Sequence, residues 1–126
     1  MSEENKKPRL LIIDDTPMML STLGNILKDD FTILVAKDGE KGIASAKKNK
    51  PVIILLDIMM PGMTGFEVIE TLKADEETKN IPVILLTGDG TDESKEKGYA
   101  LGAADYIEKP FVADVVREKV KVMSVE

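Results

Sequence analysis

The sequence has 126 residues, of which 43% are hydrophobic, a net charge of −6 at pH 7, and neither cysteine nor histidine. The length suits one domain with a proper core, and the missing side chains exclude disulfides, thiolate nucleophiles, Ser-His triads and the usual zinc sites. The acidic balance argues against direct binding of nucleic acid, which needs a cationic surface. The sequence contains no signal peptide and no apolar run long enough to span a membrane, so we expect a cytoplasmic protein without membrane contact.

Residues 1–8 form a polar leader, and residues 9–124 are expected to form a single domain. Within it, short apolar runs typical of strands alternate with segments of helical spacing. The expected strand and helix pairs are residues 10–13 and 17–27, 32–36 and 38–48, 52–56 and 64–72, 83–86 and 91–101, and 105–107 and 111–123. Strands that are apolar throughout and alternate with helices predict an α/β doubly wound fold, a five-stranded parallel sheet with helices on both faces.

Local signals mark several helix boundaries. Thr16 precedes Pro17 and is the expected N-cap of the first helix, and Thr64 with Glu67 predicts a capping box. Gly98 interrupts the fourth helix and weakens it by about 1 kcal/mol relative to alanine, which indicates either useful mobility or a loosely tolerated glycine. The last helix has an apolar face that is expected to pack on the sheet: Phe111, Val112, Val115, Val116, Val122 and Met123.

Polar side chains stand where the expected strands end. Asp14 and Asp15 follow the first strand and Asp57 follows the third, while Thr87 and Lys109 follow the fourth and fifth. Each has an ordinary explanation as a helix cap, a turn residue or a surface lysine. Ligands of open α/β sheets bind beyond the carboxyl ends of the strands, so the joint occurrence of these side chains favours one shared site.

The chemistry of this set points to a phosphoryl group and a divalent cation. Close carboxylates repel one another, and oxygen ligands favour Mg²⁺, with Mn²⁺ as the alternative. Lys109 offers a point charge and Thr87 a hydrogen-bond donor to a phosphoryl group, and the backbone N–H groups of Met59 and Gly88 are candidate contacts to the same anion. We therefore expect phosphoryl transfer in which Asp57 is the nucleophile and forms an acyl phosphate.

Four segments, LLIIDDTP, VIILLDIMMPGMTGFEVI, VILLTGDG and GAADYIEKPF, resemble the signature blocks of response-regulator receiver domains, and the resemblance covers about residues 9–123. It implies the flavodoxin-like strand order 2-1-3-4-5, which makes the strands that carry the site neighbours. It also implies a switch in a two-component or phosphorelay system. The phosphoryl group would come from a sensor histidine kinase or a phosphotransfer protein, and the face of the fourth helix, fifth strand and fifth helix would change toward an unidentified protein target.

The resemblance assigns a role to each metal-site residue. Asp57 is the phospho-acceptor, and Asp57 and Asp15 contact Mg²⁺ directly. Asp14 acts mainly through water, and the backbone carbonyl of Met59 is the third protein ligand.

The same resemblance assigns the phosphate contacts and the switch. Thr87 and Lys109 bind phosphoryl oxygens, and the Lys109-Pro110 peptide bond is expected to be cis. Tyr106 corresponds to the family's switch aromatic, which responds to the movement of Thr87. Gly88 corresponds to the small residue beside the phosphate.

Other interpretations fit the sequence less well. A phosphatase of the haloacid dehalogenase type needs a second acid two residues after the nucleophile, where Met59 stands, and a flavin protein needs a Ser/Thr-rich loop where Asp14 and Asp15 stand. A receiver-like domain that only binds partners usually lacks one of the acids, the threonine or the lysine. We expect a signalling switch rather than an enzyme, as a monomer or a weak phosphorylation-dependent dimer. The sequence leaves open whether the chain is a complete regulator or part of a longer one.

Overall fold

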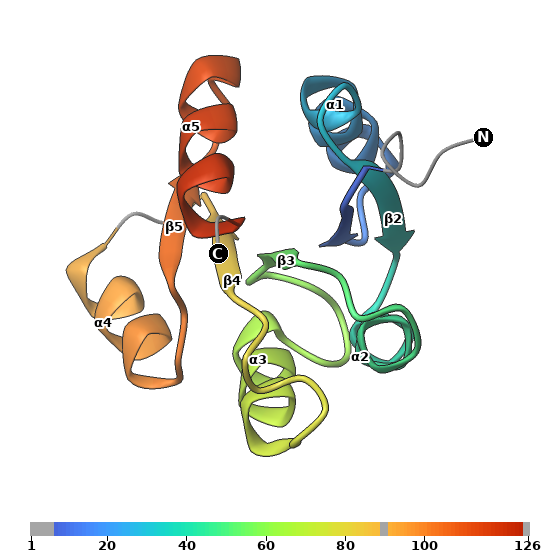
Figure 1. Ribbon diagram of the computed structural model, residues 1–126. Helices are drawn as coiled ribbons and strands as arrows, with labels where there is room; N and C mark the ends of the chain where they lie inside the picture. Colours follow the sequence, from blue (N-terminus) through green and yellow to red (C-terminus); the bar gives the residue numbers. More distant parts are fainter. Residues whose placement is uncertain (1–6, 89–90, 125–126) are drawn as a thin grey trace.

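The computed structural model describes residues 7–88 and 91–124, in which five strands alternate with five helices (Figure 1). The strands are β1 (Arg9–Ile13), β2 (Thr32–Ala36), β3 (Ile53–Asp57), β4 (Val83–Thr87) and β5 (Asp105–Glu108). The helices are α1 (Pro17–Leu27), α2 (Gly39–Asn49), α3 (Gly65–Ala74), α4 (Asp92–Ala100) and α5 (Ala113–Ser124). The expected polar leader lies outside the described residues up to residue 6.

All strand pairs are parallel, and their order is β2-β1-β3-β4-β5, which confirms the predicted topology. In the register, Ile12 of β1 pairs with Val35 of β2 and with Leu55 of β3. Because parallel strands run in one direction, the carboxyl ends of β1, β3, β4 and β5 meet at the same edge of the sheet.

Helices cover both faces of the sheet: α1 and α5 lie on one face, and α2, α3 and α4 lie on the other (Figure 1). Successive strand side chains point to opposite faces, so Leu10 and Ile12 pack toward α1 and α5, whereas Leu11 and Ile13 pack toward α2 and α3. All four side chains are fully buried. This two-sided burial explains why β1 after Arg9, β3 before Asp57 and β4 before Thr87 are apolar at every position.

The helix caps partly match the sequence signals. The capping box is confirmed, because Glu67 N–H donates to Thr64 Oγ1 over 3.2 Å and Thr64 N–H donates to Glu67 Oε1 over 2.9 Å. Thr16 stands at the N-cap of α1, but its side chain makes no capping hydrogen bond. Instead its own N–H donates to Asp14 Oδ1 over 2.9 Å. The predicted N-cap position of Thr16, followed by Pro17 in the first turn, is therefore confirmed, although the Thr16 side chain does not form the cap.

Helix α5 differs from the prediction in its start and in its packed face. It begins at Ala113, two residues later than expected, and the Val112 carbonyl accepts a hydrogen bond from Val116 N–H over 3.0 Å. Valines occupy two neighbouring stripes of this helix, and the apolar pattern alone does not say which stripe faces the sheet. The packed stripe contains Val116 and Val120, with Phe111 and Met123 beside them. The exposed side chains are Val112, Val115 and Val122.

Gly98 is not the loosely tolerated glycine that was one of the two explanations left open by the sequence, whereas its use for mobility stays a prediction. It is buried in α4, and a Cβ atom there would lie 2.6 Å from Leu85 Cδ1 and 2.8 Å from the Tyr106 hydroxyl. Close packing on the sheet therefore accounts for glycine at this position.

Among the described helices, none combines the length and the apolar composition that a membrane span requires.

Candidate functional site

Three carboxylates meet where β1 and β3 end. Asp14 and Asp15 follow β1 directly, Asp57 is the last residue of β3, and one carboxylate oxygen from each lies within 4.8 Å of those of the other two. Asp14 and Asp57 are buried at 0% and 3% exposure, while Asp15 is more exposed. The pairing of β1 with β3 brings these acids together from distant parts of the sequence.

Asp14 is poorly compensated by the protein. Its Oδ1 accepts the N–H of Thr16, but its Oδ2 is buried and has no hydrogen-bond partner within the described part of the chain. Burial raises the pKa of Asp14, and the carboxylates of Asp57 and Asp15 act in the same direction, whereas Thr16 N–H and Lys109 oppose them. A buried, unpartnered carboxylate oxygen is costly. In a group of three acids, this oxygen set fits a hard divalent cation.

Lys109 brings a positive charge to the acids. Its Nζ lies 3.2 Å from Asp57 Oδ1. The Lys109 side chain is 27% exposed, whereas the Asp57 side chain alone is 4% exposed. Its backbone N–H donates to the carbonyl of Thr87 over 2.8 Å, and its peptide bond with Pro110 is cis, as expected. The loop after β5 is thus fastened to the end of β4, and this contact directs the ammonium group toward β3.

Backbone groups and a hydroxyl complete the rim of the site. Met59 N–H donates to Asp57 Oδ1 over 3.3 Å, whereas the Met59 side chain is 75% exposed. Thr87 ends β4 and is buried at 1% exposure. Gly88 follows in an exposed position, and a Cβ atom there would meet no atom within 4 Å. The Met59 N–H thus contacts the Asp57 carboxylate, and Thr87 and Gly88 lie at the end of the neighbouring strand β4.

Gly65 is a positioning residue that the sequence interpretation did not identify. A Cβ atom there would lie 2.4 Å from the backbone oxygen of Asp57 and 2.6 Å from the Cα of Ile58. Its N–H donates to the Ile58 carbonyl over 2.9 Å, so the first turn of α3 closes against the end of β3. The available signal was a glycine directly after the capping Thr64, in a helix position that rarely favours glycine.

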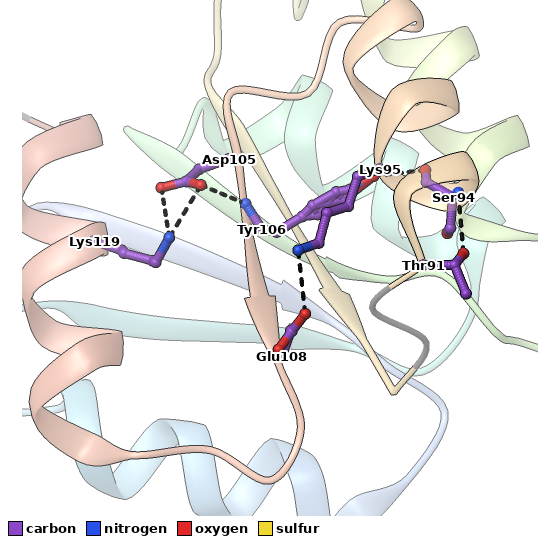
Figure 2. Close-up of polar contacts among 7 residues, drawn as sticks. All are labelled: Thr91, Ser94, Lys95, Asp105, Tyr106, Glu108 and Lys119. Atoms are coloured by element: carbon purple, nitrogen blue, oxygen red, sulfur yellow. Dashed lines mark hydrogen bonds and ion pairs between the residues drawn. The ribbon is translucent and has the colours of Figure 1, made fainter.

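Tyr106 is not part of the acid cluster. Its side chain is 4% exposed and points toward α4, where its hydroxyl donates to the Ser94 carbonyl over 2.6 Å (Figure 2). Burial raises the pKa of the Tyr106 phenol, and the neighbouring Tyr99 adds to this effect. A cavity of about 290 Å³ lies between α4 and the loop after β3, with Thr87 in its lining. The structure therefore separates the expected switch aromatic from the acids by this cavity and by β4.

The profile of the response regulator receiver domain matches residues 10–121. The chain belongs to this family. Phosphorylation of an aspartate in two-component signalling is the function of receiver domains, which receive the phosphoryl group from histidine kinases or phosphotransfer proteins. Receiver domains bind Mg²⁺ at their acidic site, and the acid cluster described above is the corresponding feature of this domain.

Two curated relatives illustrate the range of this family. Protein PilH from Pseudomonas aeruginosa is 41% identical over 103 residues, which cover 81% of this chain and 85% of PilH. The DNA-binding dual master transcriptional regulator RpaA from Synechocystis is 38% identical over 117 residues, which cover 92% of this chain and 48% of RpaA. The receiver domain thus spans about half of one relative and most of the other.

Solved structures agree with the fold. The chemotaxis protein CheY4 of Vibrio cholerae superimposes with a TM-score of 0.88 at 28% identity, over 93% of this chain and 98% of CheY4. A putative response regulator from Chloroflexus aurantiacus gives a TM-score of 0.91 at 29% identity, over 96% of this chain and all 100% of that chain. The receiver domain therefore has the expected five-stranded, CheY-like architecture.

Proposed function

We propose that Asp57 is the phosphoryl acceptor of this receiver domain. The observation that carries the proposal is the 3.2 Å pair between Asp57 Oδ1 and Lys109 Nζ, beside two further carboxylates. The pair joins a nucleophile to a cation that can later bind phosphoryl oxygens. Asp105, by contrast, is paired with Lys119 on the far side of β5 and has no acidic partners in this cluster (Figure 2).

The proposal includes Mg²⁺, with Mn²⁺ as the alternative, held by Asp14, Asp15, Asp57 and the backbone carbonyl of Met59. The unpartnered Oδ2 of Asp14 supports it, because a divalent cation would supply the compensation that the described protein groups do not. When bound, the ion supplies positive charge that offsets the negative charge of the transferring phosphoryl oxygens.

In the proposed reaction, a carboxylate oxygen of Asp57 attacks phosphorus. An O–P bond forms as the bond between phosphorus and the donor breaks, and its electron pair leaves with the donor, a phosphohistidine or a small acyl phosphate. Lys109 exchanges its contact with Asp57 Oδ1 for phosphoryl oxygens, and the Thr87 hydroxyl and the N–H groups of Met59 and Gly88 donate to the same oxygens.

Phosphorylation would then act as a switch rather than as enzymatic turnover of an external substrate. We propose that Thr87 moves toward the phosphoryl group, that Tyr106 responds, and that the α4–β5–α5 face changes for a protein target. A change from 1% to 99% active requires about 5.5 kcal/mol of differential stabilisation. The proposed setting is the cytoplasm, with a sensor histidine kinase or phosphotransfer protein as donor and a monomer or weak phosphorylation-dependent dimer as the assembly.

Labelling with acetyl phosphate tests the assignment. With Mg²⁺, we expect the parent protein to gain the mass of one phosphoryl group, and we expect Asp57→Asn to gain none. Asp105→Asn is the matched control, because Asp105 is also an acid in an ion pair with a lysine, although its side chain is more exposed than that of Asp57. Labelling of Asp57→Asn to the parental extent would show that another residue accepts the phosphoryl group.

A further inference from the structure

Strand β2 forms one margin of the sheet. Among the described residues it pairs with β1 alone, and α1 and α2 lie beside it on opposite faces (Figure 1). The Thr32 N–H donates to the carbonyl of Pro8, directly before β1, over 2.8 Å. In a parallel pair, alternate residues direct their backbone groups toward the neighbouring strand. The N–H and C=O groups of Ile33 and Val35 therefore point away from β1, toward the outer edge.

This edge lacks the usual protection against pairing with another strand. Residues Thr32–Ala36 include no charged residue, proline or glycine, and Val35 is 51% exposed. Natural edge strands are commonly protected by charges, prolines, bulges or a covering segment. The opposite margin, β5, carries Asp105 and Glu108, which pair with lysines of α5 and α4 (Figure 2). The two margins of the sheet thus differ, and β2 is the one suited to accept a further strand.

The charges that flank β2 favour a second copy of the same strand in the antiparallel direction. Asp29 and Asp30 precede β2 and Lys37 follows it, and all three residues are exposed. An antiparallel pair brings Lys37 of each copy beside the aspartates of the other, whereas a parallel pair brings like charges together. Asp38 lies at the same end as Lys37, but its side chain caps α2 and accepts the Lys41 N–H over 2.8 Å.

The outward backbone groups also select a register. Ile33 of each copy faces Val35 of the other as a hydrogen-bonded pair, and the two-fold axis passes between the two Leu34 residues. A register with Ile33 opposite itself would place Val35 opposite Phe31, whose N–H already donates within the loop after α1. A register with Val35 opposite itself would place Ile33 opposite Lys37, beyond the end of β2.

We infer that the outer edge of β2 is an interface for a second copy of this chain, paired antiparallel so that the two sheets become continuous. The carboxyl ends of the two sheets then point in opposite directions, and neither acid cluster lies in the contact. The contact does not involve Asp57 and is independent of its phosphorylation. Because the strand is short, the association is weak, with a dissociation constant between about 10 μM and 1 mM.

Disulfide cross-linking of the full chain tests the register, because the sequence contains no cysteine. In the paired dimer the two Leu34 residues have Cα atoms about 4.5 Å apart, within the range of a disulfide. The two Thr32 residues are about 13 Å apart, since each lies opposite Ala36. With oxidised glutathione, we expect Leu34→Cys to form a covalent dimer at least about tenfold faster than Thr32→Cys.

Exposure alone predicts the reverse order. Thr32 is exposed and Leu34 is half-buried, so random collisions would cross-link Thr32→Cys at least as fast. An equal or faster reaction of Thr32→Cys would therefore overturn the proposed interface.

Sedimentation equilibrium tests the contact without an added thiol. We expect the average mass of the parent chain to rise from monomer toward dimer between about 10 μM and 1 mM. Val35→Lys places a charge on the open edge and should lower the association constant at least about tenfold. Val122→Lys is the matched control, because Val122 is a 61% exposed valine of α5, and it should have no effect. A monomeric mass up to about 1 mM, or equal losses in the two variants, would contradict the inference.

Exchange of the flanking charges tests the antiparallel direction. Lys37→Asp and Asp30→Lys should each lower the association constant about threefold, because each places like charges side by side. The double variant restores opposite charges across the contact and should recover the parental association constant. Additive losses in the double variant would show that the two ends of β2 do not meet.

Discussion

Lys109 Nζ lies 3.2 Å from Asp57 Oδ1, although the two residues are 52 positions apart and their strands are not neighbours. Strand β4 lies between β3 and β5, so the lysine reaches across the end of β4. The Thr87 carbonyl at that end accepts the Lys109 N–H. One residue therefore ties together the carboxyl ends of three strands and neutralises charge at the candidate acceptor.

Removal of the Lys109 ammonium group should lower both the stability of the protein and its rate of labelling. In Lys109→Ala, the nearly buried Asp57 loses a charged hydrogen-bond partner, so we expect the metal-free protein to lose about 2 kcal/mol of unfolding free energy. The rate of labelling by acetyl phosphate should fall by about 100-fold or more, because a donor to the phosphoryl oxygens is missing. Urea denaturation in a chelator measures the first effect and intact-mass kinetics the second.

Lys79→Ala is the control for that experiment. Lys79 pairs with Glu76 over 2.9 Å, but the two side chains are 43% and 85% exposed. Such a pair contributes less than about 1 kcal/mol, and it lies far from the acids. A parental labelling rate in Lys109→Ala would exclude the proposed role of Lys109 in binding the phosphoryl group.

Asp14→Asn should stabilise the metal-free protein. Because burial raises the pKa of Asp14 in the folded state, ionisation of this group favours the unfolded state. The penalty is absent below the unfolded value of 3.8 and is complete above the raised folded value. Denaturation in a chelator at pH 7 should therefore show a gain of about 1 kcal/mol for the variant, and the gain should vanish at low pH.

Added Mg²⁺ should reverse the stability order of the parent protein and Asp14→Asn. An ion that binds only the folded state stabilises it, and Asp14→Asn removes one of the carboxylates that hold it. We expect added Mg²⁺ to raise the melting temperature of the parent protein more than that of the variant. Equal shifts for both proteins would show that Asp14 does not contribute to metal binding.

Much of the site was predictable because it depends on topology. Strand ends are visible in the sequence as polar residues after apolar runs, and parallel strands place their carboxyl ends at one edge. Asp14 and Asp57 therefore needed only the strand order to come together, and Thr87 ends the neighbouring strand as predicted. The capping box at Thr64 was equally visible, because both of its partners are local.

The errors arise where packing from a distant element decides the outcome. Val115 and Val116 are the same residue type on adjacent stripes of α5, and contacts with β3 and α1 decide which one is buried. Gly98 resembled a weak point of a helix until the Tyr106 hydroxyl appeared beside it. Gly65 is constrained by the backbone of Asp57 in the preceding strand. The glycine after Thr64 was visible in the sequence, but the helical pattern does not say which element approaches it.

Gly65→Ala and Gly88→Ala should therefore behave differently although both positions adjoin the site. The methyl group at position 65 meets strand backbone, which cannot move aside cheaply, so we expect a loss of about 2–3 kcal/mol and slower labelling. The methyl group at position 88 enters open space and should change the unfolding free energy by less than about 0.5 kcal/mol. Chemical denaturation measures both effects, and equal losses would contradict the close approach of α3 to β3.

Ionisation of Asp75 should make part of the free energy of unfolding depend on pH. The N–H of Glu77 is the main cause of its lowered pKa, and Lys47 lowers the pKa further from a distance of 3.2 Å. A lowered folded pKa means that the stabilisation is present above the unfolded value of 3.8 and is lost as the pH falls through the folded value. The difference in unfolding free energy between the parent and Asp75→Asn should therefore be constant from pH 7 to about pH 5 and should shrink below 3.8.

High salt should distinguish the two interactions that lower the pKa of Asp75, the one with the Glu77 N–H and the one with Lys47. Charge on the exposed Lys47 is screened at about 1 M salt, whereas the short bond from the Glu77 N–H is not, so part of the difference should persist. Lys47→Met should reproduce the loss caused by salt, and salt should then have little further effect on that variant. A difference that disappears entirely in high salt would show that the lysine, rather than the backbone of the loop after α3, is the main partner of Asp75.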